Sequence, residues 1–134
     1  MHDPFMRTLG LDGEVPAPGQ ARVWGRVQPG HLNNWGSAHG GFLYTLADAA
    51  FALASNSHGA LAVALSTHME YLKPCRPGDL LTATATELHL GRRVGVYRID
   101  VRRDEDLLAT FTGTVHRRPD ETSPLMPAVP AQPG

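Results

Sequence analysis

The sequence lacks the material for several classes of protein. Its only cysteine is Cys75, so no disulfide can form within the chain and secretion gains no support from its redox chemistry. Acidic and basic residues nearly balance, with a formal net charge of -1, which leaves no broad basic field for nucleic acid or anionic lipid. No segment reaches the roughly 20 apolar residues of a membrane span, and the first residues lack a basic region followed by an apolar one. We therefore expect a cytoplasmic protein.

The length and composition are those of one globular unit. The chain has 134 residues, of which 42% are hydrophobic, enough for a single core and too few for a nucleotide-binding domain with a second domain. Residues 119–134 include five prolines and show little periodicity. We predict a single domain over residues 1–118 and a flexible, proline-rich C-terminal tail over residues 119–134.

Strand patterns occupy most of the chain, and one long helical pattern interrupts them. Asp3 can cap a short helix that ends at Leu9, and the segment 13–20 breaks it. Alternation of side chains, bounded by turns rich in proline, glycine and charge, predicts five strands. They cover residues 21–27, 62–73, 80–90, 94–103 and 108–117.

A helix is predicted over residues 41–57, with Gly59 as a left-handed cap beyond its end. Its apolar residues recur at intervals of three and four, and alanines fill much of the remaining surface, which is typical of a buried helix. One strand, one long helix and four strands in order favour an α+β fold, with a curled antiparallel β-sheet wrapped around one long central α-helix.

Asp48 is the one carboxylate in this apolar helix. Burying an unpaired acid is costly, so we interpret it as a working carboxylate; the alternative is an aspartate held by a local hydroxyl or a buried arginine. Helical spacing aligns it with Tyr44, Thr45, Ala52 and Ser55 in a thin polar stripe.

Gly40 and Gly41 stand at the start of the helix, where backbone amides have no partner within the helix. Such amides can hold a phosphate or polarise a carbonyl oxygen during acyl transfer, although a flexible helix start without a ligand is equally compatible. Asp48 lies eight residues further on, about 12 Å along the helix axis, which is too far to serve the same reacting atom. If both act in one reaction, one of them must come from a second subunit, and we expect a symmetric dimer.

Asn33 and His39 complete the set of candidates next to the glycines. The amide of Asn33 could hydrogen-bond a carbonyl or orient water, or it could simply belong to a turn. His39 is expected to hydrogen-bond at the helix start rather than act as a base.

These residues resemble a known family. Asn33, the run His39-Gly40-Gly41 and the pair Ala47-Asp48, together with HMEYLKPCRPGDLLTATA, VYRIDV and ATFTGTVHRR, are similar to the PaaI-type hot-dog thioesterases of phenylacetate degradation over about residues 20–118. The resemblance implies a hot-dog fold, dimers that pair into tetramers, and hydrolysis of acyl-coenzyme A (acyl-CoA) thioesters, with aryl-acetyl groups a favoured class. No cofactor is expected, since CoA is part of the substrate.

By position, the resemblance assigns the polarising amide to Gly40, assistance at the carbonyl or water to Asn33, and the role of general base or nucleophile to Asp48 of the facing subunit. We predict further substrate contacts from five residues: His39, Gly41, Tyr44, Ser66 and Thr67. Four basic residues are predicted to hold the CoA phosphates: Lys73, Arg92, Arg93 and Arg117. The size of the acyl pocket is expected to depend on Tyr44, Phe51, Asn56, Thr67 and Met69.

Other functions find less support. The chain has no G-x-S-x-G motif for a serine hydrolase, and its seven histidines show no zinc spacing, so no metal is predicted. Hot-dog hydratases acting on enoyl-CoA usually place a histidine five residues after the aspartate, where this chain has Leu53. A non-enzymatic acyl-CoA sensor or assembly partner remains an alternative, although no output module is present.

Overall fold

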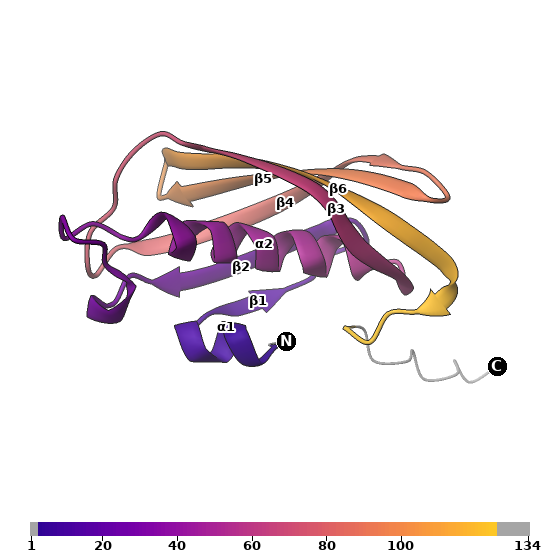
Figure 1. Cartoon of the computed structure of the whole chain (residues 1–134), viewed down its shortest axis with the longest axis horizontal. Helices are drawn as coiled ribbons and strands as arrows, with labels where there is room; N and C mark the ends of the chain where they lie inside the picture. The colour runs from indigo at the N-terminus through magenta and orange to yellow at the C-terminus, as the bar shows by residue number, and fades with distance from the viewer. Residues whose placement is uncertain (1–2, 126–134) are drawn as a thin grey trace.

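One antiparallel sheet curls over one long helix, α2 (Gly40–Asn56), in the computed structural model, which describes residues 3–125 (Figure 1). The strands are β1 (Asp12–Glu14), β2 (Gln20–Arg26), β3 (Ala60–Tyr71), β4 (Leu80–Leu90), β5 (Val94–Arg103) and β6 (Asp106–Thr122). Neighbouring strands pair in the order β1-β2-β4-β5-β6-β3. Two short helices, α1 (Pro4–Leu9) and a 3-10 turn (Pro29–His31), precede α2. The predicted α+β hot-dog architecture is confirmed.

Small residues let α2 pack closely into the concave face of the sheet. Gly113 of β6 lies under the ring of Phe51, where an added Cβ would sit 2.6 Å from the nearest ring atom. In β4 the alanines of the TATAT run, Ala83 and Ala85, are buried, while Thr84 and Thr86 on the opposite face are exposed. Alternation of period two therefore produces the buried face that the sequence predicts.

The C-terminal end of α2 is fixed by a buried side chain, Asn56. Its amide group donates to the carbonyl oxygens of Ala52 and Ala62, and its oxygen accepts hydrogen bonds from the Ala62 N–H and the Ser123 hydroxyl. The Ser123 N–H donates in turn to the carbonyl of Gly59, whose φ of 91° fits its predicted left-handed conformation. All hydrogen-bonding groups of Asn56 are used, so this end of the helix is a structural anchor.

Two local predictions are wrong, and one strand was not predicted. The first helix ends at Leu9 as expected, but no strand was predicted beyond it, where Asp12–Glu14 pairs with β2 as β1. The tail does not begin at residue 119: β6 continues to Thr122, and Ser123 is buried. Ser55 leaves the polar stripe of α2, since it is buried and bonds the carbonyl of Ala52. Residues 126–134 of the predicted tail lie outside the described part.

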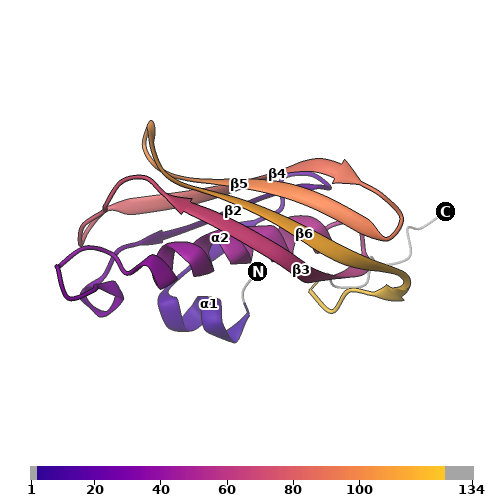
Figure 2. The same ribbon diagram turned by 45° about the horizontal axis from the view of Figure 1, so that its top comes forward.

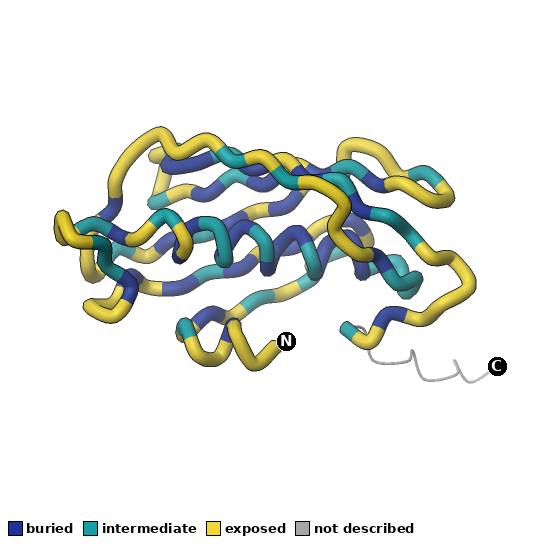
Figure 3. Tube along the Cα trace, in the orientation of Figure 1, coloured by how far each residue is buried: buried dark blue, intermediate teal, exposed yellow. Residues whose placement is uncertain are grey.

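β3 is an edge strand of 12 residues with no neighbour on its outer side in the described chain (Figure 2). A bulge interrupts its pairing with β6 between Ala64 and Ser66. Val63 and Leu65 are exposed beside it, and Figure 3 shows how little of this strand is buried compared with β5. A long apolar edge normally requires a covering partner.

Within residues 3–125, no helix is long and apolar enough to cross a membrane.

Candidate active site

At the start of α2, most backbone N–H groups are hydrogen-bonded and one is left free. His39 caps the helix: its Nδ1 accepts the Gly41 N–H at 2.8 Å, and its carbonyl accepts the Phe42 N–H at 2.9 Å. The Gly40 N–H has no acceptor within residues 3–125. One amide at the positive end of the helix dipole is thus left for a ligand. His39 takes the capping position expected of it.

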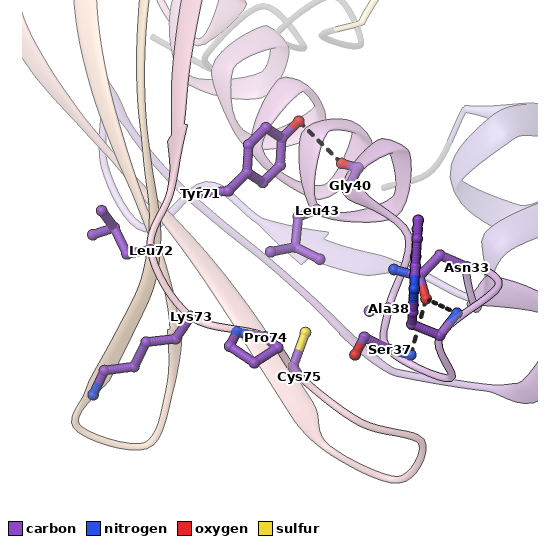
Figure 4. A pocket seen from close by; sticks show the side chains of 11 residues that line it. Asn33, Ser37, Ala38, Gly40, Leu43, Tyr71, Leu72, Lys73, Pro74 and Cys75 are labelled. Carbon is purple, nitrogen blue, oxygen red and sulfur yellow. Dashed lines mark hydrogen bonds between the residues drawn. The ribbon is translucent and has the colours of Figure 1, made fainter.

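A cavity of about 450 Å³ opens beside Gly40 (Figure 4). The loop that precedes α2, the first turn of α2 and the end of β3 form its walls. Its lining includes Asn33, Trp35, Leu43, Tyr71, Lys73 and Cys75. The Tyr71 hydroxyl donates to the carbonyl of Gly40 at 3.2 Å. The cavity combines apolar walls with one free backbone donor, a common design for a small-molecule site.

Asn33 lies in this cavity but also builds the loop around it. Its Oδ1 accepts the N–H groups of Trp35 at 2.9 Å and Ser37 at 3.1 Å, and its own N–H donates to the Ser37 carbonyl at 2.8 Å. The oxygen is therefore committed to an Asx turn. Only the NH₂ group of Asn33 remains to donate to a substrate carbonyl or to water.

Asp48 sits on α2, half-buried, and makes no hydrogen bond or ion pair with any residue of the described chain. Burial raises the pKa of its carboxyl, and the carboxylate of Asp3 adds to the effect. The structure thus offers neither a local hydroxyl nor an arginine as a partner, since the nearby Thr45 hydroxyl bonds the carbonyl of Gly41 instead. Asp48 does not line the cavity at Gly40.

None of the other five predicted substrate contacts lines the cavity at Gly40. His39 and Gly41 line a separate hollow with Phe42, whereas Tyr44 lies on α2 and Ser66 and Thr67 lie on β3. Tyr44 and Thr67 hydrogen-bond through their hydroxyls at 2.5 Å, which connects α2 to β3. Ser66 is exposed next to the bulge of β3. The expected pocket roles of Phe51 and Asn56 are wrong, because Phe51 packs in the core and Asn56 is held in its buried network.

The four predicted CoA contacts lie at two ends of the subunit. Lys73 lines the cavity and pairs with Asp106 at 3.3 Å. Arg117 pairs with Ala62 in the sheet, nine residues from Tyr71 along β3 (71 minus 62), or roughly 30 Å at about 3.3 Å per residue. Arg92 and Arg93 lie at the β4–β5 turn, and Arg117 is tied to that turn because it donates to the Gly91 carbonyl. These three arginines cannot reach the Gly40 cavity of their own subunit.

The arrangement of the described residues supports neither a metal site nor a hydratase site. Among residues 3–125, no cluster of three or more histidine, cysteine, aspartate or glutamate side chains could hold a metal ion. Leu53, at the position of the hydratase histidine, is buried in the core, where its Cδ1 would lie 3.1 Å from a Cβ added at Gly13.

Sequence reasoning assigned no site role to Tyr71 or Trp35, both of which line the cavity. Trp35 is 86% exposed although its backbone is held by Asn33. Tyr71 lies 31 residues from Gly40 in the sequence, and only the course of β3 past the helix start brings the two together. No local pattern could have indicated this contact.

Several known proteins are similar to this chain in both sequence and fold. Residues 36–110 match the family model of the thioesterase superfamily. The acyl-coenzyme A thioesterase PaaI of Escherichia coli is 42% identical over 117 residues, which span 87% of this chain and 84% of that protein. A variant of the phenylacetic acid degradation protein PaaI of Thermus thermophilus superposes with a TM-score of 0.84 at 52% identity, covering 87% of this chain and all of that chain.

A third similar structure contains a ligand. The smu.793 protein of Streptococcus mutans, bound to acetyl CoA, superposes with a TM-score of 0.78 at 31% identity, covering 83% of this chain and 90% of that chain. These likenesses confirm the family indicated by the sequence. The chain belongs to the thioesterase superfamily and, within it, to the PaaI-type acyl-CoA thioesterases, and it is a thioester hydrolase.

Proposed function

We propose that the enzyme hydrolyses aryl-acetyl-CoA thioesters, such as phenylacetyl-CoA or its hydroxylated forms, to the free acid and CoA. The similarity to a phenylacetic acid degradation protein supports this substrate class. The cavity beside Gly40 supports it as well, since the rings of Trp35 and Tyr71 are available to pack against an aryl group. No cofactor takes part, because CoA belongs to the substrate and product.

The observation that carries the mechanism is the free Gly40 N–H at the start of α2. This amide donates to the thioester oxygen and stabilises the negative charge that develops there as the carbonyl carbon is attacked. The NH₂ group of Asn33 assists at the carbonyl or at the attacking water. Asp48 acts as general base toward water or attacks the carbonyl itself as a nucleophile.

Asp48 is supplied by the partner subunit. Gly40 and Asp48 of one chain are eight residues apart on a single helix, about 12 Å along its axis, and one cavity does not contain both. The exposed edge of β3 offers a way to join two copies into one continuous sheet. A two-fold axis at β3 then runs the two α2 helices antiparallel on one face of that sheet, with two equal sites per dimer. We propose that such dimers pair again into tetramers.

The same dimer explains the distant arginines. If β3 pairs with its copy about the middle of the strand, Ala62 of one subunit faces the region of Glu70 in the other, near the mouth of the other cavity. Arg92, Arg93 and Arg117 of the partner subunit then join Lys73 near the CoA phosphates. His39, Gly41, Tyr44, Ser66 and Thr67 keep their proposed contacts around the reacting end.

Two complementary variants test the shared site. Gly40→Pro removes the N–H at the first helical position, where proline is well tolerated, and His39 already has the extended conformation required before proline, with φ -61° and ψ 139°. Asp48→Asn removes the carboxylate. We expect each variant alone to lose about a hundredfold or more in the release of thiol from phenylacetyl-CoA.

Co-expression of the two variants should restore activity. Each mixed dimer then contains one site with both defects and one intact site, so activity should recover to about half per mixed dimer by the two-fold symmetry. Gly40→Ala is the matched control: it keeps the N–H, and its added Cβ would make an ordinary 3.4 Å contact with the Tyr71 ring. Mixed dimers without recovered activity would place Gly40 and Asp48 in the same subunit's site and refute the shared one.

A further inference from the structure

Two successive peptide groups at the start of α2 determine the direction of the free Gly40 N–H. The first, between His39 and Gly40, is fixed through its carbonyl, which accepts the Phe42 N–H at 2.9 Å. Because the N–H and C=O of a trans peptide point in opposite directions, this bond turns the Gly40 N–H outward from the helix start. The His39 N–H is itself anchored to the carbonyl of His31 at 2.7 Å.

The second peptide group, between Gly40 and Gly41, is held on both sides by side chains. The Tyr71 hydroxyl donates to its carbonyl oxygen at 3.2 Å (Figure 4). On the other side, His39 Nδ1 accepts its N–H at 2.8 Å. Two consecutive glycines allow more backbone rotation than any other pair. The hydrogen bonds of the helix hold this peptide from one side, and the two side-chain contacts restrict the remaining rotation about Gly40, on which the aim of the free amide depends.

Tyr71 is well suited to this task. It lies at the end of β3, and its ring would contact a Cβ at Gly40 at 3.4 Å, so it covers that residue as well as bonding it. Burial raises the pKa of its hydroxyl, with the neighbouring Tyr44 adding to the effect, so the hydroxyl remains a donor at neutral pH. Its side chain is nevertheless 53% exposed toward the cavity and solvent, and a structural core residue would be more deeply buried.

We propose that Tyr71 is a positioning residue of the thioesterase: its hydroxyl holds the Gly40–Gly41 peptide so that the Gly40 N–H points at the thioester oxygen. This inference rests on the proposed role of the Gly40 amide. It assigns Tyr71 no bond to the substrate and no proton to transfer. Its effect is on the alignment of the oxyanion donor, where small displacements have large costs in rate.

Tyr71→Phe removes one oxygen atom and keeps the ring, and the position is exposed enough that the fold will not depend on it. We expect kcat for phenylacetyl-CoA to fall about fivefold, in line with one neutral hydrogen bond, and KM to change less than about twofold. Glu105→Gln is the control, because Glu105 is exposed at the β5–β6 turn, outside the cavity lining and outside β3, and its exchange should leave both constants unchanged.

The carbonyl stretching band of bound phenylacetyl-CoA provides a readout that a purely structural role would not move. The measurement is made by infrared spectroscopy in Asp48→Asn, which is expected to bind the thioester and to cleave it slowly. The band should lie below its frequency in water. Adding Tyr71→Phe should shift it back toward the frequency in water, because the carbonyl is less polarised. An unchanged band together with an unchanged kcat would overturn the proposal.

The two proposals fail in different ways. If the wild-type enzyme does not cleave phenylacetyl-CoA but binds it, the substrate assignment fails, and the wild-type and Tyr71→Phe carbonyl bands can be compared directly. If Gly40→Pro retains full activity, the role of the Gly40 amide fails, and that of Tyr71 fails with it. If Gly40→Pro is inactive while Tyr71→Phe is unimpaired in both measurements, only the role of Tyr71 is refuted.

Discussion

The two ends of the helix α2 treat polar groups in opposite ways. At the C-terminal end, Asn56 uses all of its hydrogen-bonding groups, and nearby Glu87 accepts hydrogen bonds from Tyr97 and His58, both at 2.6 Å. In the N-terminal half, the Gly40 N–H and the Asp48 carboxylate have no partner within residues 3–125. Satisfied groups hold the fold together, whereas unsatisfied ones are costly and persist where a ligand or a partner subunit completes them.

The pKa directions of the two carboxylates express the same contrast. Burial raises the pKa of Asp48. Burial would raise that of Glu87 too, but hydrogen bonds from Tyr97 and His58 outweigh it and the pKa is lowered. The contributions of these two carboxyl groups to the free energy of unfolding therefore change with pH in opposite directions, and this difference can be measured.

The largest expected effect comes from exchanging one carboxylate at a time for its amide. Asp48→Asn should reduce kcat for thiol release by about a hundredfold or more, because the general base or nucleophile is lost. Glu87→Gln, the matched change near the other end, should keep kcat within about twofold at a temperature where the variant is folded. Steady-state kinetics on both variants test this prediction. An Asp48→Asn enzyme with wild-type kcat would show that Asp48 has no catalytic role.

The second effect is on folding and belongs to the C-terminal end alone. Asn56→Leu should lower the free energy of unfolding by about 2 kcal/mol, because the buried N–H and C=O of Ala62 lose their partners. Urea unfolding measures the change, and Asn34→Ala, at an exposed loop position, is the neutral control. The refolded Asn56→Leu protein should retain its kcat. Stability equal to that of the wild type would show that the network anchors nothing.

Glu87→Gln should lower stability by about 1.5 kcal/mol at pH 7, since hydrogen bonds to a charged acceptor are the stronger kind. The folded-state pKa of Glu87 lies below its ordinary 4.5, so its stabilising effect is complete above that value and is lost as the pH falls through the lowered folded pKa. The difference in unfolding free energy between wild type and variant should therefore shrink in acid. A difference that grows as the pH falls would contradict the assigned shift.

The smallest effect has the opposite sign. Asp48→Asn should raise the midpoint of thermal unfolding by about 3 °C at pH 7, because a partly buried charge without a partner is removed. The folded-state pKa of Asp48 lies above 3.8, so the proton favours the folded protein, and the penalty of the charge appears as the pH rises through the raised value. Below pH 3.8 the two proteins should melt together. Melting curves at equal protein concentration test this, with Asn34→Ala again neutral.

The sequence predicted the parts of this structure that local patterns determine. Period-two alternation located β4 and β5 at their observed bounds, and the helical repeat located α2 to within one residue at each end. Gly40 and Asp48 could be read as candidates because they are neighbours on one helix, where the helical rise gives their separation directly.

Long-range contacts set the features that the sequence did not reveal. The three polar residues of β1 have no alternation and are a strand only because β2 lies beside them. Residues 119–122 resemble a tail in composition, yet pairing of Thr122 with Ala60 holds them in β6. Tyr71 reaches Gly40 only through the topology of the sheet, so its role depends on contacts that spacing cannot supply.

If two copies pair at the exposed edge of β3, as proposed above, the activity of the enzyme in the cell depends on its own concentration. On the proposed mechanism, the pairing that covers this edge also brings Asp48 of one subunit to the Gly40 amide of the other, so assembly and catalytic competence arise in one event. A newly made chain would fold and still leave the thioester pool untouched until it met a second copy. Activity per molecule would then rise with enzyme concentration, and the amount synthesised would act as a threshold rather than as a proportional control.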